Sequence, residues 1–368
     1  MARGRAVIFS GPGRPFEDVQ YPVPEVLRPG EILVRNRLAT VCGSDLHTTR
    51  GRRSFATPSI LGHEVVGEIA ALGSDVSSDT AGRRLSEGDR VVWSIAASCG
   101  SCYYCRVAGL PQKCSALFKY GHGSCECPPH FNGGFADYTL LREGTSVFSV
   151  PESVDDREAA PIGCAAATVV AAFDALAPRS FEHVVIAGAG MLGTYAAIAA
   201  GDLHARSVTV VERIADRRDS ILRFGADRAV AWDAARDEAV RLELLDATEG
   251  FGADIVIEAT GDPQIVPLAV DLLRPGGQLV LLGSVYPGST IRLDPYDLIR
   301  KSITMVGSHN YRPDHLLRAV RLVERRRSAV PLIDLAPIVG TLSAETVSQA
   351  METLADGSAL RPAIRISG

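Results

Sequence analysis

Short runs of alternating apolar and polar residues occupy roughly the first 150 residues of the chain, a pattern typical of strands with one buried face. Turns rich in Gly and Pro, such as Arg28-Pro29-Gly30, separate these runs. The predicted strands are Gly4–Ser10, Glu31–Thr40, Glu64–Leu72 and Arg90–Ala96, with Asn132–Leu141 continuing the pattern after a Gly-Gly turn. We therefore expect a mainly β first domain.

The pattern of apolar and polar residues changes near Pro161, where short apolar runs begin to alternate with helical stretches. The runs are HVVIAG, SVTVVE, ADIVIEATG and GQLVLLGSV, and helices are expected from Met191 and from Ala215. Short buried strands that alternate with helices predict a doubly wound parallel sheet, and the fold class is therefore α/β. From Tyr311 onward we expect an Arg-rich helix and a closing strand around Pro362–Ile366.

Length and composition are those of an ordinary globular protein. The 368 residues favour two domains, because single hydrophobic cores rarely grow beyond roughly 300 residues. A net charge of −5 gives no reason to expect nucleic-acid or membrane binding. The most apolar helical candidate, Ala159–Leu176, is interrupted by Pro161 and predicts a buried helix. We find no targeting signal and expect a cytoplasmic protein.

The segment His183–Gly193 reads HVVIAGAGMLG, a buried strand followed by Gly188-x-Gly190-x-x-Gly193 and a helix. Glycines in this context allow a tight turn and the close approach of a pyrophosphate to the helix N-terminus. The next strand ends at Glu212, whose carboxylate suits a ribose 2′-hydroxyl and repels a 2′-phosphate. We expect NAD rather than NADP, although the adjacent Arg213 softens that preference. A flavin-type or nucleotide-free sheet with a glycine turn is the alternative.

Cysteine usage suggests metal rather than disulfides, since the chain has eight cysteines and no export signal. The pattern Cys99-x-x-Cys102-x-x-Cys105-x8-Cys114 supplies four closely spaced thiolates, which predicts a closed, structural zinc site. Its alternative is a loop of free thiols.

A second, dispersed set contains Cys42 in VCGSDLH, His63 in LGHE and Cys164 in PIGCAA. Three protein ligands and one open position are typical of a catalytic zinc. Glu64 is a further candidate, either as a carboxylate that orients a ligand or as an alternate ligand. Each residue taken singly is better explained as a buried thiol or a core histidine, and spacing alone does not bring the three together.

Together these motifs make the chain resemble the zinc-containing medium-chain dehydrogenase/reductase family, to which alcohol, polyol and threonine dehydrogenases belong. The matching elements are Cys42–His47, Gly62-His63-Glu64, the four-cysteine segment, Gly133–Ala136 with Tyr138, the glycine fingerprint, Glu258–Gly261 and Arg274–Gly277. The resemblance implies a GroES-like, zinc-binding catalytic domain at residues 1–163 and 308–368, and a Rossmann domain at residues 164–307. It also implies two zinc ions per chain and a homodimer or homotetramer.

The same resemblance implies roles for individual residues. Cys42, His63 and Cys164 would bind the catalytic zinc, Ser44 would hydrogen-bond the alcohol, Asp45 would orient the metal ligands, and His47 would pass the proton to solvent. Thr168, Met191 and Leu192 would join the glycines, Glu212 and Arg213 in binding the cofactor. The expected substrate is a small alcohol or its aldehyde. A polyol or amino-alcohol dehydrogenase and a catalytically silent dinucleotide-binding protein are the alternatives.

Three guanidinium groups, Arg50, Arg52 and Arg53, follow His47 directly, and His309 lies in a polar cluster near the return to the first domain. Such groups suit an anionic substrate or simply form a solvated loop. The elements GLPQKC, Lys119–His122, Gly190–Gly193, GSVYPG and SHNYRPDHL resemble a branch associated with phosphonate metabolism, which implies a hydroxyalkylphosphonate substrate. Cys125, Cys127, His122 and His130 would form a further metal site or, as we expect, a loop without metal.

Overall fold

The computed structural model describes residues 2–176, 182–233, 235–285 and 287–367. The chain forms two compact units, one of Met1–Ala167, Tyr311–Glu324 and Leu332–Gly368, the other of Thr168–Asn310 and Arg325–Pro331. Tyr286, within the GSVYPG element, lies outside the described residues. Among the described residues, no helix has the length and apolarity needed to cross a membrane.

The first unit is built on antiparallel β-structure. Its strands are β1 (Arg3–Phe9), β2 (Glu17–Pro22), β3 (Ile32–Thr40), β4 (Ser59–Ile60), β5 (Glu64–Leu72), β6 (Arg90–Ala97), β7 (Phe118–Lys119), β8 (Tyr138–Leu141), β9 (Thr145–Ser149), β16 (Ile338–Thr341) and β17 (Ala363–Arg365). One sheet has the order β2-β1-β4, and the larger one runs β16-β17-β3-β5-β6-β7, with β8 beside β3 and β9 beside β6. β17 and β5 therefore flank β3, which places residues from distant parts of the sequence on neighbouring strands.

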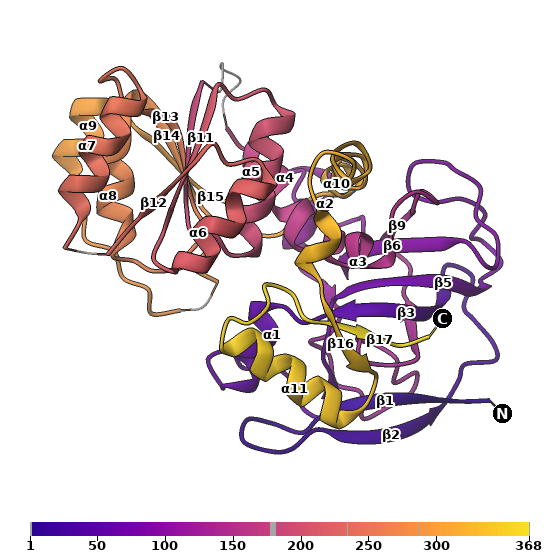
Figure 1. Ribbon diagram of the computed structural model, residues 1–368. Coiled ribbons are helices and arrows are strands. Elements are labelled where there is room, and N and C mark those ends of the chain that lie inside the picture. Colours follow the sequence, from indigo (N-terminus) through magenta and orange to yellow (C-terminus); the bar gives the residue numbers. More distant parts are fainter. Residues whose placement is uncertain (1, 177–181, 234, 286, 368) are drawn as a thin grey trace. The chain divides into compact units, whose positions relative to one another are not determined.

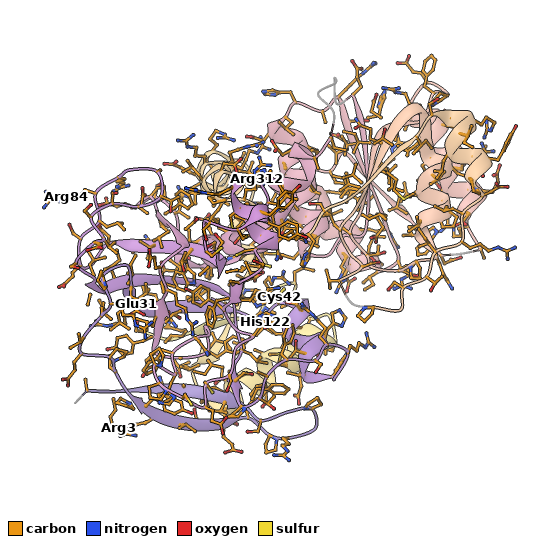
Figure 2. All side chains as sticks on the ribbon, turned by 180° about the vertical axis from the view of Figure 1, so that it is seen from behind. Arg3, Glu31, Cys42, Arg84, His122 and Arg312 are labelled. Carbon is orange, nitrogen blue, oxygen red and sulfur yellow. The ribbon has the colours of Figure 1, made fainter. Side chains whose placement is uncertain are left out.

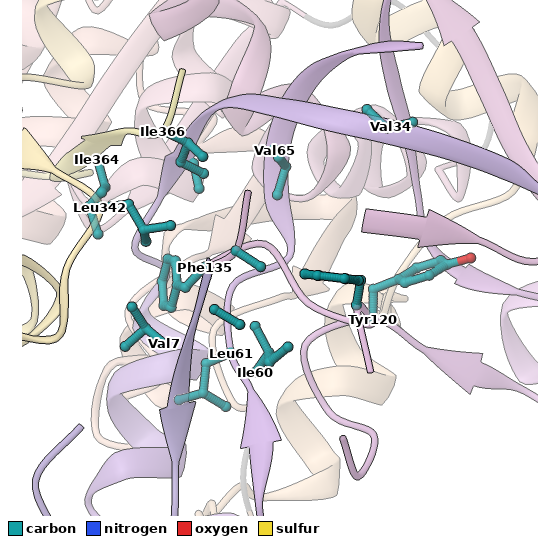
Figure 3. Packing of buried hydrophobic residues seen from close by; sticks show 14 of the residues in the cluster. Val7, Val34, Ile60, Leu61, Val65, Tyr120, Phe135, Leu342, Ile364 and Ile366 are labelled. Carbon is teal, nitrogen blue, oxygen red and sulfur yellow. The ribbon is translucent and has the colours of Figure 1, made fainter. Parts of the chain in front are cut away.

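Short helices complete this unit. They are α1 (Gly43–Thr49), α2 (Tyr103–Arg106), α3 (Asp156–Ala159), α11 (Ala344–Ala355), most of α10 (Pro313–Arg326), and the 3-10 turns η1 (Pro111–Lys113), η2 (Ala160–Gly163) and η4 (Leu332–Leu335). The core packs strand residues against α11 and the C-terminal strand, and Figure 3 shows Phe135 among Val7, Leu61, Leu342 and Ile364. This core anchors the strand ends from which the candidate ligands project.

The second unit is a six-stranded, fully parallel sheet with the order β12-β11-β10-β13-β14-β15. Its strands are β10 (His183–Ala187), β11 (Ser207–Glu212), β12 (Arg228–Ala231), β13 (Ala253–Glu258), β14 (Leu273–Leu281) and β15 (Thr304–Gly307). Its helices are α5 (Met191–Asp202), α6 (Ala215–Ile221), η3 (Leu222–Phe224), α7 (Asp237–Ala247), α8 (Ile265–Leu272), α9 (Pro295–Lys301) and most of α4 (Ala165–Asp174). Figure 1 shows α5 and α6 on one face of the sheet and α7, α8 and α9 on the other. The α/β, doubly wound fold class is confirmed.

The structure corrects three element predictions. Within Asn132–Leu141 only Tyr138–Leu141 is a strand, because Gly134 and Phe135 turn to donate backbone hydrogen bonds to Gly62 and Leu61. In the apolar segment 159–176 the buried helix α4 begins only at Ala165, because the 3-10 turn η2 occupies the interruption predicted at Pro161. The run GQLVLLGSV contributes only the end of β14, which begins at Leu273.

Candidate active site

Four candidate ligands from three separate segments meet in the first unit. The donor atoms of Cys42, His63, Glu64 and Cys164 all lie within 4.8 Å of one another, and we call these four residues the donor set. Cys42, His63 and Glu64 are buried. The predicted ligands, which spacing alone could not bring together, are therefore neighbours in the fold.

Local structure explains how Cys42 and His63 are held. Cys42 precedes α1, and its backbone N–H donates to the Asp45 carboxylate at 2.9 Å, which is a capping arrangement for the first turn of that helix. The other oxygen of Asp45 lies 3.3 Å from Nδ1 of His63. Asp45 thus lies on the Nδ1 side of the imidazole and leaves Nε2 available to a metal, an arrangement common among metal-binding histidines.

Glu64 begins β5 and has a buried cation beside it. Its Oε2 accepts a 2.6 Å hydrogen bond from Thr40 and forms a 2.9 Å ion pair with Arg361. The register explains this contact, because Thr40 pairs with Glu64 across β3 and β5 and with Ala363 across β3 and β17. The sequence analysis missed Arg361, which lies about 300 positions from its partner and carries no local motif.

The electrostatics of the donor set favour a bound cation. A hydrogen bond between the two thiols holds the pKa of Cys42 well below its usual value and raises that of Cys164 well above it. Burial lowers the pKa of His63, but Asp45 and Cys42 outweigh this effect and raise it to about 10. Glu64 Oε1 is buried and has no hydrogen-bond partner among the described residues. Two thiols, an imidazole and an unsatisfied carboxylate oxygen within 4.8 Å fit zinc.

The two predicted proton-carrying residues lie on α1, three positions apart and hence on one face of the helix. The Ser44 hydroxyl is 3.3 Å from Nε2 of His63, so it borders the donor set. Partial burial lowers the pKa of His47, and the guanidinium groups of Arg52 and Arg53 lower it further. His47 therefore stays neutral to lower pH than an ordinary histidine, which suits a proton acceptor.

Of the three arginines after α1, Arg50 and Arg52 are exposed whereas Arg53 is half-buried. The Arg53 guanidinium lies 4.9 Å from the ring centre of Phe55, and that ring meets His122 edge-on at 4.2 Å. His122 in turn is 5.5 Å from His63, ring centre to ring centre. Figure 2 shows His122 near Cys42. Contacts therefore connect the arginine segment to the donor set.

The four predicted structural ligands also come together. The sulfur atoms of Cys99, Cys102, Cys105 and Cys114 lie within 4.8 Å of one another, around the short helices α2 and η1. Backbone N–H groups of Cys102 and Ala116 donate to cysteine sulfurs at 3.4 Å. Such hydrogen bonds stabilise thiolates, and the cluster fits a closed zinc site with no position for substrate. We call it the cysteine lobe.

The glycine fingerprint forms one wall of a pocket in the second unit. Gly188 adopts φ +101°, and a Cβ on Gly193 would lie 1.8 Å from the Gly188 carbonyl oxygen, so neither position admits a side chain. Gly190 caps the 12-residue helix α5. A Cβ added at Gly190 would have no atom within 4 Å, so there is space for a ligand at the helix N-terminus. Met191 and Leu192 form the first turn of α5.

Glu212 and Arg213 line the same pocket, which has a volume of about 250 Å³. Both carboxylate oxygens of Glu212 accept backbone hydrogen bonds, from Ala189 at 2.7 Å and from Ile214 at 2.9 Å. Arg213 forms a 3.5 Å ion pair with Asp262. The sequence analysis proposed none of the other lining side chains as cofactor residues; these are Val211, Ile214, Arg217, Trp232, Ala259, Thr260 and Asp262. The glycine cradle and the acidic residue fit a dinucleotide.

His309 and Thr168, which we also predicted as site residues, belong neither to the pocket nor to the two cysteine-containing groups. His309 is exposed in the second unit, and Thr168 lies in α4. Among the described residues, no group of candidate metal ligands contains His122, Cys125, Cys127 or His130. His130 instead stacks on Tyr21 at 4.1 Å.

Comparisons with known proteins support the same reading. Residues 28–152 match the family model for the alcohol dehydrogenase GroES-like domain, and residues 191–325 match that for zinc-binding dehydrogenase. The chain is 32% identical to 5-exo-hydroxycamphor dehydrogenase of Pseudomonas putida over 91% of its own length and 92% of the relative's. An alcohol dehydrogenase structure from Thermotoga maritima has a TM-score of 0.93, 30% identity and full coverage of both chains.

A structure of galactitol-1-phosphate dehydrogenase from Escherichia coli is also similar, with a TM-score of 0.82, 26% identity and coverage of 98% and 99% of the two chains. The likeness to these proteins spans both units of the chain. The chain therefore belongs to the zinc-binding alcohol dehydrogenase family.

Proposed function

We propose that this protein oxidises an alcohol that carries an anionic group, or reduces the corresponding carbonyl compound, with NAD as the hydride carrier. The observation that carries this proposal is the donor set, with the Ser44 hydroxyl 3.3 Å from His63. Cys42, His63 and Cys164 would hold the zinc, and Glu64 would be an alternate ligand. When bound, zinc supplies Lewis acidity that lowers the pKa of an alcohol oxygen.

The protein's own residues would then handle the proton. Ser44 would accept a hydrogen bond from the alcohol O–H and pass the proton toward His47 on the same helix face. The lowered pKa of His47 leaves its ring neutral and able to accept that proton. Asp45 and the Arg361–Glu64 pair would hold the donor atoms in place. The nicotinamide, when bound, accepts the hydride that the alcohol carbon gives up.

NAD is favoured over NADP by Glu212. Its carboxylate is fixed by two backbone N–H groups at the edge of the cofactor pocket, where a 2′-phosphate would meet a second negative charge. The ion pair with Asp262 also engages Arg213, the cation best placed in sequence to offset that charge. We expect Glu212→Gln, which keeps the shape, to lower kcat/KM for NAD about tenfold and to reduce the discrimination against NADP. Unchanged cofactor preference would contradict this role.

An anionic substrate is supported by the contacts from Arg53 through Phe55 and His122 to His63. Galactitol-1-phosphate dehydrogenase, one of the structural relatives, is named for a phosphate-bearing alcohol. Within this class we propose a hydroxyalkylphosphonate.

The direct test compares two alcohols of equal length, hydroxyethylphosphonate and propanol, as donors for NAD reduction by the zinc-loaded protein. We expect the phosphonate to have the higher kcat/KM. Preference for propanol, or for a neutral polyol, would replace the anionic substrate with a neutral one. No NAD reduction with any alcohol would contradict the proposed activity itself.

A further inference from the structure

Lys119 lies close to the candidate active site in the fold but has no part in the proposed proton transfer. It ends β7, where it pairs with Ala96 of β6, and its side chain is half-buried. Among the described residues, its ammonium group has no hydrogen-bond or ion-pair partner. The chain's other two lysines, Lys113 and Lys301, lie elsewhere, on the cysteine lobe and at the end of α9.

The backbone around Lys119 connects it to the donor set. The next residue, Tyr120, donates its N–H to Ile95 at 3.0 Å, and Ile95 donates to the hydroxyl of Tyr311 at 3.2 Å. That hydroxyl hydrogen-bonds to the carbonyl of Gly163, which directly precedes Cys164. On the other side, the Tyr120 carbonyl accepts the Nδ1–H of His122 at 2.8 Å. β7 is thus fixed between the Cys164 turn and the His122 ring.

Several charged groups act on the ammonium group of Lys119. Burial lowers the pKa of Lys119, the Arg53 guanidinium lowers it further, and Cys164, Cys42 and Asp45 oppose the shift. The contacts agree with this: Arg53 lies over Phe55, Phe55 meets His122, and His122 is hydrogen-bonded to Tyr120, the residue after Lys119. Burial and the charge of Lys119 also keep the pKa of His122 well below its usual value, so the ring between these cations is neutral.

Two half-buried cations beside the same neutral ring are stabilised when an anion binds between them. Asp45, one acidic group near Lys119, already accepts hydrogen bonds from the Cys42 and Gly62 backbone and lies beside His63, and Glu64 is paired with Arg361. We propose that Lys119 and Arg53 bind the acidic group of the substrate beside the donor set. This inference rests on the proposed function, which it deepens by naming Lys119 as a recognition residue.

The two positive charges indicate the chemical class of the ligand. A phosphonate or phosphate monoester carries more than one negative charge near neutral pH and matches two cations, whereas a carboxylate carries only one. Lys119 acts on this group as a point charge, and Arg53, oriented over Phe55, supplies a planar fork. Both cations belong to the same compact unit as the donor set.

The test uses a binding probe that needs no turnover. Ethylphosphonate is titrated by calorimetry into the zinc-loaded protein, into Lys119→Met, and into Arg84→Met, which removes an exposed cation outside the site. We expect Lys119→Met to weaken ethylphosphonate binding about ten- to hundredfold, Lys119→Arg to recover part of it, and Arg84→Met to change nothing. Propionate, the carboxylate of similar length, should bind more weakly than ethylphosphonate to the wild type.

Kinetics separate this inference from the proposed function. In Lys119→Met, KM for hydroxyethylphosphonate should rise while kcat/KM for propanol stays within about twofold of wild type. Three results would overturn the role of Lys119. They are equal ethylphosphonate affinity in wild type and Lys119→Met, no binding to either protein, and an equal fall in kcat/KM for hydroxyethylphosphonate and propanol in Lys119→Met. If Lys119-dependent binding persists but no alcohol reduces NAD, the anion site stands and the proposed reaction is wrong.

Discussion

At the scale of single residues, the ion pair between Glu64 and Arg361 joins a candidate metal ligand to a buried cation. Burial raises the pKa of Glu64 to about 7, even though Arg361 opposes the shift. Both side chains are almost fully shielded from water, at 0% and 7% exposure. A charge in such a place is tolerated only with its partner, so each residue depends on the other.

Removing Arg361 alone should therefore be costly. We expect Arg361→Met to lower the free energy of unfolding by about 3–5 kcal/mol, because the buried Glu64 carboxylate loses its ion-pair partner. Urea denaturation of the zinc-loaded protein measures the loss. The double variant Glu64→Gln/Arg361→Met serves as the control and should recover much of it. A double variant as unstable as the single one would show that packing of the Arg361 side chain, rather than charge, is what matters.

At the scale of elements, α1 and the segment that follows it place a proton acceptor and several cations next to each other. The guanidinium groups of Arg52 and Arg53 lower the pKa of His47. His47 is active as a base only when neutral, so activity is lost as the pH falls through its pKa. The cations therefore extend the active range toward acid.

Neutralising those cations should have the opposite effect. In Arg52→Gln/Arg53→Gln the pKa of His47 moves back up toward its ordinary value, and the acidic limb of the kcat/KM profile for propanol should shift to higher pH. A neutral substrate is used so that lost anion binding does not confound the result. Arg84→Gln should leave the profile in place, and an unshifted limb in the double variant would mean that His47 does not carry the proton.

Elements also show where sequence reasoning succeeds and where it stops. The cysteine lobe and the glycine fingerprint were predictable because their spacing is local, within 16 and six residues respectively. The contact of Arg361 with Glu64 was not predictable, because it depends on the register of β17, β3 and β5. Asp262 is similar, because its loop reaches Arg213 only through the order of strands in the parallel sheet.

At the scale of the whole molecule, the two candidate zinc sites have different surroundings. The donor set is mostly buried and includes one carboxylate, whereas the cysteine lobe has four thiols, with Cys99 exposed and Cys114 buried. They use separate ligands from separate segments, so their metal contents should vary independently. Two sites with no shared ligand should also show additive effects on stability.

Metal analysis of a matched set of variants can test this independence. The wild type should contain two zinc ions per chain, His63→Ala and Cys102→Ser one each, and the combined variant none. His63→Ala should lose turnover by several orders of magnitude with its fold retained by circular dichroism, because the alcohol loses its Lewis acid. Cys102→Ser should instead make residues 98–116 sensitive to protease, with activity falling only as far as folded protein is lost. A His63→Ala variant that keeps both zinc ions and full activity would refute the catalytic assignment. The assignment of the cysteine lobe as a zinc site would not be affected.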